Sequence, residues 1–181
     1  MVAQGAWTRF ALILGIFVLG AVLTHRNPLL IRALAPFDRL TAQATAAVLS
    51  WHGMEVNRED AILSHPTGFG YEIYYRCTGL LPAAFLAVGV FVFPTRLRPK
   101  LVGIAIGVPL IFSLNLIRLA SLFYIGVWHP SLFDLAHTVI WESVLLLFIV
   151  GFWLWWMRQC QPSRSAHANP TRMSVSGRMR I

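Results

Sequence analysis

The chain has 181 residues, of which 57% are hydrophobic and 12% charged, and its mean hydropathy is +0.65. This composition is too apolar for an ordinary water-soluble fold, and the length leaves no room for a separate soluble domain. The net charge of +8 does not indicate a nucleic-acid interface, because the basic residues collect beside apolar runs instead of alternating with aromatics.

Apolar runs predict about four transmembrane helices. They cover residues 7–24, 78–94, 101–128 and about 138–157. The first run is marginal, with about 18 residues against the ~20 that a bilayer core requires. A cleaved signal peptide is the competing interpretation, but the Ala-x-Ala pattern at 33–35 lies beyond two arginines and precedes Pro36. We therefore expect an uncleaved anchor.

The distribution of arginine and lysine predicts the orientation in the cytoplasmic (inner) membrane. Arg96, Arg98 and Lys100 lie between the second and third runs, and further arginines follow the fourth run. The positive-inside rule places both groups, and therefore both termini, in the cytoplasm. We expect one transmembrane domain at 1–157 and a basic, disordered tail at 158–181 that lies close to anionic membrane lipid.

The segment 24–76 is then expected outside the membrane. Residues 29–49 predict an interfacial amphipathic helix whose polar side carries Arg32, Asp38, Arg39 and Gln43. A fifth, tilted span is the alternative, disfavoured by three charges and a proline. Residues 54–75 predict a small extracytoplasmic loop or hairpin, with turns at 57–60 and 68–70. The expected fold class is an all-α integral membrane protein.

The cysteine content indicates one thiol with a chemical role. The two residues, Cys77 and Cys160, are too few for a disulfide framework or a structural zinc site. Cys77 stands where the outer segment meets the second span, beside Arg76 and a helix start, which can stabilise a thiolate. A small buried hydrophobic residue is the alternative. Cys160 is expected on the cytoplasmic side, too distant to bond with Cys77.

Two further residues are expected at the membrane level of Cys77. Arg118 lies inside an apolar run, where a guanidinium costs at least ~2.5 kcal/mol and marks a functional site by default. It could instead snorkel to the outer surface, or pair with Glu72, Asp134 or Glu142 to hold helices together. His137 opens the fourth span on the outer side and can transfer protons near neutral pH. Topology therefore predicts that Cys77, Arg118 and His137 converge.

These residues resemble the exosortase/archaeosortase family, which has a Cys-Ser-Gly-like turn, an Asn-x-x-Arg helix and a helix-opening His. The corresponding residues are Cys77-Thr78-Gly79, Asn115 with Arg118, and His137. Threonine replaces the commoner serine but keeps the hydroxyl, and the chain is shorter than many-helix members. Its size resembles the compact exosortase H subtype.

The resemblance implies a membrane cysteine protease and transpeptidase. Such an enzyme cleaves the C-terminal sorting signals of exported proteins at the outer face, and no cofactor or metal is implied. Cys77 would be the nucleophile, His137 the proton-transfer group and Arg118 the oxyanion or substrate ligand. Asn115, Thr78 and Gly79 would support them. Asp134 or Glu142 could orient the imidazole, and neither is assigned.

Alternatives from other classes remain open. In a non-enzymatic assembly or transport component, Arg118 and His137 would form a structural polar bridge and Cys77 would be dispensable. A lipid-binding protein that acts through its basic tail is a third interpretation. The sequence lacks the His-Glu-x-x-His and Gly-x-Ser-x-Gly patterns of other hydrolases. It does not specify the oligomeric state.

Overall fold

The computed structural model describes residues 27–160 and Gly15, and most of this part of the chain is helical. The predicted first span at 7–24 and the tail beyond residue 160 lie outside the described residues. The elements, in chain order, are α2 (Pro28–Trp51), β1 (Asn57–Glu59), β2 (Ile62–Ser64), β3 (Gly70–Glu72), α3 (Leu80–Val92), α4 (Leu97–Trp128), a 3-10 turn (Pro130–Leu132), α5 (Phe133–Leu135), a π-helical turn (Ala136–Ile140) and α6 (Trp141–Cys160).

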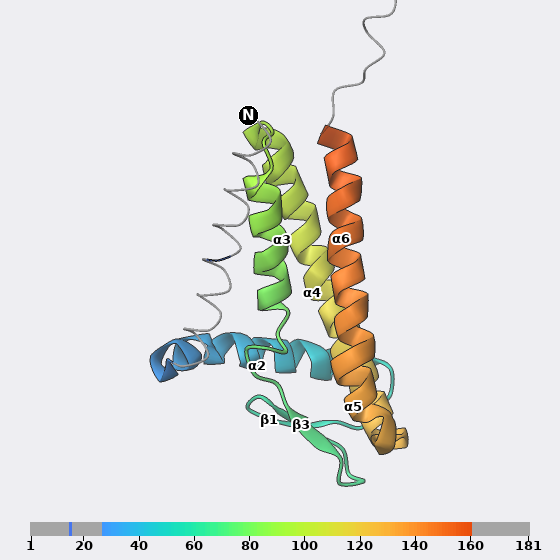
Figure 1. Ribbon diagram of the computed structural model, residues 1–181. Coiled ribbons are helices and arrows are strands. Elements are labelled where there is room, and N and C mark those ends of the chain that lie inside the picture. The colour runs from blue at the N-terminus through green and yellow to red at the C-terminus, as the bar shows by residue number, and fades with distance from the viewer. Residues whose placement is uncertain (1–14, 16–26, 161–181) are drawn as a thin grey trace, which may run out of the picture.

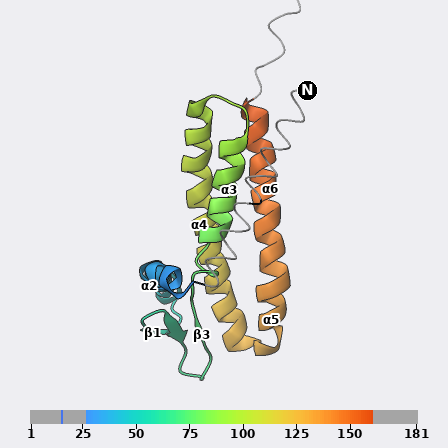
Figure 2. The ribbon, with the colours of Figure 1, turned by 60° about the vertical axis from the view of Figure 1, so that its left-hand side comes forward.

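Helices α3, α4 and α6 stand side by side as an upright bundle (Figures 1 and 2). Two helical segments among the described residues, Leu97–Trp128 and Pro130–Cys160, are long and apolar enough to cross a membrane. Helix α3 is apolar but has 13 residues, which rise about 20 Å and fall short of a ~30 Å hydrocarbon core. The second predicted span is therefore a helix, but a shorter one than expected.

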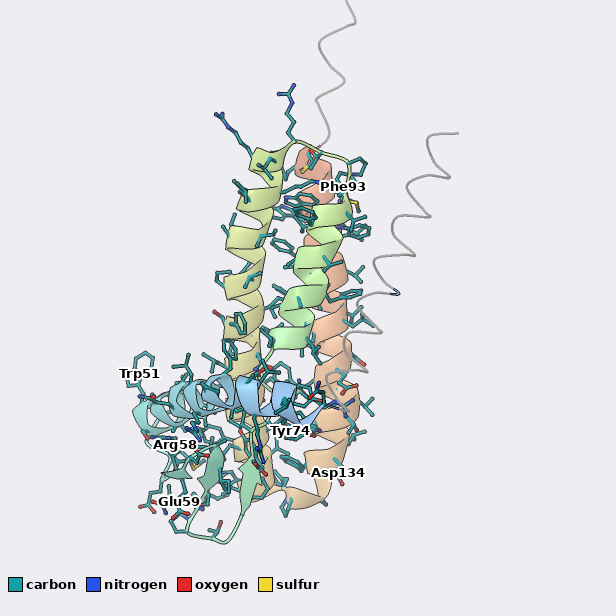
Figure 3. The ribbon with its side chains drawn as sticks, turned by 90° about the vertical axis from the view of Figure 1, so that its left-hand side faces the viewer. Trp51, Arg58, Glu59, Tyr74, Phe93 and Asp134 are labelled. Carbon is teal, nitrogen blue, oxygen red and sulfur yellow. The ribbon has the colours of Figure 1, made fainter. Side chains whose placement is uncertain are left out.

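Close packing holds the three helices together at the end away from the sheet, where Figure 3 labels Phe93. Gly103 of α4 lies directly against the indole of Trp156, and a methyl group at this position would overlap the ring. The same indole donates a hydrogen bond from Nε1 to the carbonyl of Pro99 at 3.0 Å. Trp153 donates likewise to Gly89 at 3.3 Å. The tryptophans thus tie α6 to both neighbouring helices.

Helix α2 lies across the lower end of the bundle, as Figure 1 shows, instead of alongside it. Asn27 caps its first turn, since the Asn27 side chain accepts a hydrogen bond from the Leu29 amide at 3.0 Å. The predicted helix at 29–49 is confirmed. Asp38 departs from expectation: the sequence assigns it to the polar side, but it is 8% exposed. The buried face of α2 also includes Thr41, Ala42, Thr45 and Leu49.

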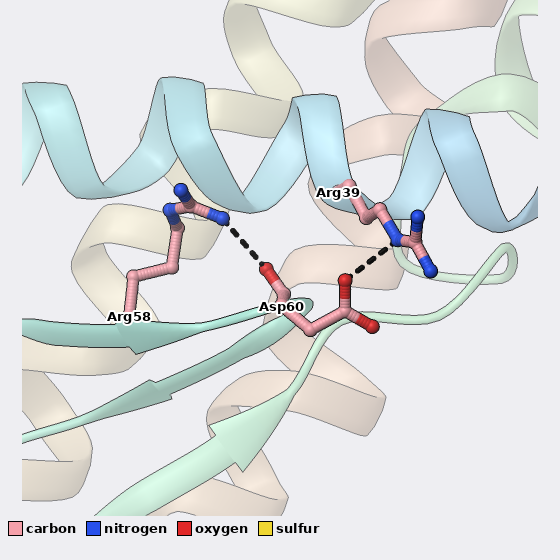
Figure 4. A network of polar contacts seen from close by, with 3 residues as sticks. All are labelled: Arg39, Arg58 and Asp60. Carbon is pink, nitrogen blue, oxygen red and sulfur yellow. Dashed lines mark hydrogen bonds and ion pairs between the residues drawn. The ribbon is translucent and has the colours of Figure 1, made fainter.

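Beneath α2 lies a three-stranded antiparallel sheet in the order β1-β2-β3. Residues 57–59, predicted as part of a turn, form strand β1, and the turn is confined to Asp60 and Ala61. Asp60 joins the sheet to α2 (Figure 4), because its carboxylate pairs with Arg39 Nε at 2.6 Å. Its main-chain carbonyl accepts a hydrogen bond from Arg58 at 3.0 Å.

One buried cluster connects α2, the sheet and the lower half of α4. Leu49 of α2, Leu63 of β2, Ile73 after β3 and Phe123 of α4 are all fully buried in it. Cys77 belongs to the same cluster. The residue therefore sits where the sheet, α2 and α4 meet, just before α3 begins.

Candidate active site

A short, hydrogen-bonded turn between β3 and α3 positions Cys77. The Cys77 amide donates to the carbonyl of Tyr74 at 2.7 Å, and the Thr78 hydroxyl donates to the carbonyl of Tyr75 at 2.8 Å. Gly79 ends the turn with a φ of 80°, a left-handed conformation that glycine adopts without a steric penalty. Cys77 is 8% exposed, so most of the residue is shielded from solvent.

Asn115 attaches this turn to α4. Its side-chain Nδ2 donates to the main-chain carbonyl of Cys77 at 2.8 Å, and the residue is 1% exposed. A Cβ atom on Gly79 would lie 3.0 Å from Asn115 Cβ. Glycine is thus required at position 79 both for its backbone conformation and for the close approach of Asn115.

His137 reaches Cys77 from the other side of the site. Its Nε2 lies 4.0 Å from the Cys77 Sγ. The imidazole is held in place by the Phe133 ring, which is parallel to it within 2° at a centroid distance of 5.8 Å. Both residues lie at the start of the helical segment that continues into α6, at the end of the molecule where Figure 3 labels Tyr74 and Asp134.

Arg118 is 5% exposed, and its Nε has no hydrogen-bond partner among the described residues. In this part of the chain it forms no ion pair with Glu72, Asp134 or Glu142. Its position on α4 is one helical turn after Asn115. A buried guanidinium without an anion is available to a ligand or to a developing negative charge.

Cys77, Arg118 and His137 line one cavity of about 510 Å³. The predicted convergence of these three side chains is therefore present in the structure. Asn115, Thr78 and Gly79 are not among the residues that line the cavity, and they act on the geometry of the Cys77 turn instead. The remaining lining residues are Tyr74, Arg76, Leu81, Pro82, Phe85, Glu142, Leu145, Leu146 and Ile149.

Burial raises the pKa of the Cys77 thiol above its ordinary value. The Arg118 guanidinium is the strongest of the influences that lower this pKa, followed by a backbone hydrogen bond from Tyr74, with Arg76 weakest. The sequence emphasised Arg76, but Arg118 has the larger effect. Because the net shift is upward, the resting residue is a neutral thiol that requires a base for attack.

The structure adds two residues that the sequence did not assign. Tyr71 donates a hydrogen bond from its hydroxyl to the carbonyl of Leu119 at 2.9 Å, next to Arg118. Glu142 lines the cavity, whereas Asp134, the other acid considered, does not.

Cys160 is a free thiol at the end of α6. No group of three or more His, Cys, Asp or Glu within the described residues is arranged to hold a metal ion.

One known protein family matches this chain. The family model described as Transmembrane exosortase (Exosortase_EpsH) matches residues 1–156. The chain belongs to the transmembrane exosortase family. No curated protein and no solved structure matches it. Exosortases are membrane proteins, generally proteases or transpeptidases of the cysteine type. The cavity around Cys77 is therefore the candidate active site of this exosortase.

Proposed function

We propose that this exosortase is a membrane-embedded cysteine protease and transpeptidase that cleaves C-terminal sorting signals of exported proteins. The observation that carries the proposal is the meeting of Cys77, Arg118 and His137 in one cavity. Each residue comes from a different segment of the chain, and each type suits one requirement of acyl transfer: a nucleophile, a fixed cation and a proton carrier.

The reaction begins with proton transfer from the Cys77 thiol to His137. A neutral thiol is a poor nucleophile, and the imidazole Nε2 at 4.0 Å is the nearest base to Sγ that the structure shows. This separation is longer than a hydrogen bond, but such contacts often tighten when substrate binds. The thiolate then attacks the carbonyl carbon of the scissile peptide bond.

Arg118 stabilises the negative charge that forms on the carbonyl oxygen. Arg118 is buried and its Nε has no partner among the described residues, so its guanidinium is largely dehydrated before substrate arrives. When the tetrahedral intermediate collapses, the C–N bond breaks and His137 returns its proton to the leaving amine. The resulting thioester on Cys77 is released by water, or by an acceptor amine or hydroxyl.

We further propose four transmembrane segments, in which the residues that flank the short helix α3 complete its crossing, with α2 and the sheet on the outer face of the inner membrane and both termini in the cytoplasm. Helix α2 supports an interfacial position because it lies across the bundle end and exposes large apolar side chains, including Leu29 at 72%, Leu40 at 59% and Trp51 at 87%. The basic residues around the start of α4, Arg96, Arg98 and Lys100, belong to the opposite end of the bundle, where Figure 1 places the beginning of α4.

A processing assay tests the activity. Wild-type enzyme and the variants Cys77→Ala, Arg118→Ala and His137→Ala are co-expressed with a protein that carries a candidate C-terminal sorting helix. We expect wild type to shorten the substrate and all three variants to leave it intact while remaining folded. Cys160→Ala is the matched control and should process normally. Normal processing by Cys77→Ala would overturn the proposal in favour of a structural role.

Thiol labelling tests the orientation separately. In a background without Cys77 and Cys160, a cysteine replaces either Glu59 on the sheet or Arg98 at the other end, both of which are exposed. A membrane-impermeant maleimide should label Glu59→Cys in cells with a permeabilised outer envelope and an intact inner membrane. Arg98→Cys should react only after that membrane is opened. The reverse pattern would invert the topology.

A further inference from the structure

The cavity contains two charged side chains that the proposed reaction does not use, Arg76 and Glu142. Among the described residues, Glu142 is the only acid that lines it, and Arg76 and Arg118 line it as well. Glu142 is exposed, and it has no ion pair or hydrogen bond with another described residue. It belongs to a helical segment long and apolar enough to cross the membrane. A carboxylate in such a segment is costly and indicates a polar ligand.

The π-helical turn at Ala136–Ile140 brings Glu142 into this cavity. In an α-helix, residues five apart lie on nearly opposite sides, because 3.6 residues complete a turn. In a π-helical turn the hydrogen bonds connect residues five apart, as between the Trp141 amide and the Ala136 carbonyl. His137 and Glu142 can therefore face the same cavity, and both do. Such turns occur frequently at functional sites.

Glu142 lies beside the apolar part of the cavity. Its helix continues with Leu145, Leu146 and Ile149, which face Leu81 and Phe85 of α3 across the same space. A second cavity of about 190 Å³ continues along both helices and shares Phe85 and Ile149 with the first. The two cavities form an apolar groove between α3 and α6 that leads from Cys77 toward the middle of the bundle, with Glu142 near its polar end.

We infer that Glu142 binds the amine side of the scissile bond and that the α3–α6 groove holds the apolar segment released from the substrate. The inference rests on the proposed function. Before cleavage, the carboxylate accepts hydrogen bonds from the free main-chain N–H groups at the start of that segment. Cleavage breaks the C–N bond and leaves an α-amine, which takes a further proton from water to become an ammonium group. Glu142 then neutralises that ammonium.

Charge complementarity favours this occupant over a lipid acyl chain. An acyl chain would fill the apolar groove, but it carries no positive group that the Glu142 carboxylate could neutralise. A peptide segment supplies both an apolar body and a positive end. Because the positive end is created by the reaction itself, Glu142 is placed to bind the product as well as the substrate, so the released segment should inhibit the enzyme.

The test measures binding of a synthetic peptide with the sequence of the candidate C-terminal sorting helix used in the processing assay, prepared with a free α-amine or an acetylated one. The full-length Cys77→Ala protein is used in detergent, so binding does not depend on turnover. We expect the free amine to bind about tenfold or more tightly than the acetylated peptide, a difference that corresponds to about 1.4 kcal/mol. Glu142→Gln should remove this preference, and Asp134→Asn, the matched control outside the cavity, should retain it.

Equal binding of the two peptides, or a preference that survives Glu142→Gln, would overturn the inference and point to a lipid-like occupant. In wild-type background, Glu142→Gln should also slow processing about tenfold while leaving the alkylation rate of Cys77 unchanged. A parallel loss of alkylation would show that Glu142 acts on the thiol instead of the substrate. If wild type processes nothing but amine-dependent binding persists, the proposed protease activity fails and the binding site stands.

Discussion

The side-chain amide of Asn115 on α4 donates a hydrogen bond of 2.8 Å to the main-chain carbonyl of Cys77, a residue 38 positions earlier. One helical turn after Asn115, the same helix carries Arg118. The two residues of the Asn-x-x-Arg pattern therefore have different structural roles. Asn115 holds the turn that carries Cys77, and Arg118 supplies the cation near the thiol.

Replacing Asn115 with Ala should disturb the Cys77 turn. The buried Cys77 carbonyl would lose the donor that the structure shows, which costs roughly 1–3 kcal/mol of stability. We also expect processing to fall about tenfold or more, because a small displacement of a nucleophile is enough for such a loss. Ser121→Ala is the control, since it removes a hydroxyl that donates to the Arg118 carbonyl within the same helix. Wild-type processing by Asn115→Ala would contradict this role.

Gly79→Ala should be damaging for two independent reasons. The residue has a positive φ of 80°, and its new methyl group would lie 3.0 Å from Asn115 Cβ. A strained backbone of this kind costs on the order of 1–3 kcal/mol. Thermal unfolding in detergent and the processing assay should both show the loss. Gly151→Ala is the matched control, because a methyl group there meets no atom within 4 Å, and it should be neutral or slightly stabilising.

The residues of the candidate site were easier to predict from the sequence than the surrounding structure, namely the π-helical turn, the buried side of α2 and strand β1. Charge bias and hydropathy predicted that Cys77, Arg118 and His137 lie at one membrane level, and in the structure the three residues line one cavity. The role of Glu142 could not be predicted, because helical periodicity of 3.6 puts it on a different side from His137. Only the π-helical turn changes that relation, and nothing in the residues 136–140 identifies such a turn beforehand.

Helix α2 and the sheet show the same limit. The apolar and polar residues of 29–49 predicted a helix correctly, but amphipathic pattern alone placed Asp38 on the solvent side. Asp38 lies on the buried face of α2 instead, and the packing of α2 on the sheet depends on contacts across the chain, such as Arg39 with Asp60. The strand at Asn57–Glu59 was similarly missed because its charged sequence resembles a turn. It is an exposed edge strand, where charged residues are common.

The reactivity of Cys77 should depend on pH in a defined direction. Since burial raises its pKa, the alkylation rate in a Cys160→Ser background should rise with a midpoint above the ~8.5 of an ordinary thiol. Arg118→Ala should move the midpoint higher still, because the cation that lowers the pKa is removed. Arg118→Lys keeps the charge and should shift it less, and Arg76→Ala should have the smallest effect. A midpoint well below 8 would instead indicate a resting thiolate–imidazolium pair.

Asp38 should make the stability of the protein depend on pH. It is 8% exposed and its Oδ1 has no hydrogen-bond partner in the described chain. Burial, together with the Glu72 carboxylate, raises the pKa of Asp38 from 3.8 to about 6. The folded protein therefore binds a proton more tightly than the unfolded chain does. The stabilisation from the protonated form is complete below about pH 4 and is lost as the pH rises through about 6.

Asp38→Asn removes this dependence while keeping the side-chain shape. At pH 8 the variant should be more stable than wild type by about 1–3 kcal/mol, the lower end applying where water screens the carboxylate, and near pH 4 the difference should disappear. Thermal unfolding in detergent at several pH values measures both, and Glu59→Gln, an exposed acid on the sheet, should change neither. A variant less stable than wild type at pH 8 would mean that the Asp38 carboxylate has a cationic partner. Arg118 would be the first candidate, because its buried guanidinium has an unpaired Nε.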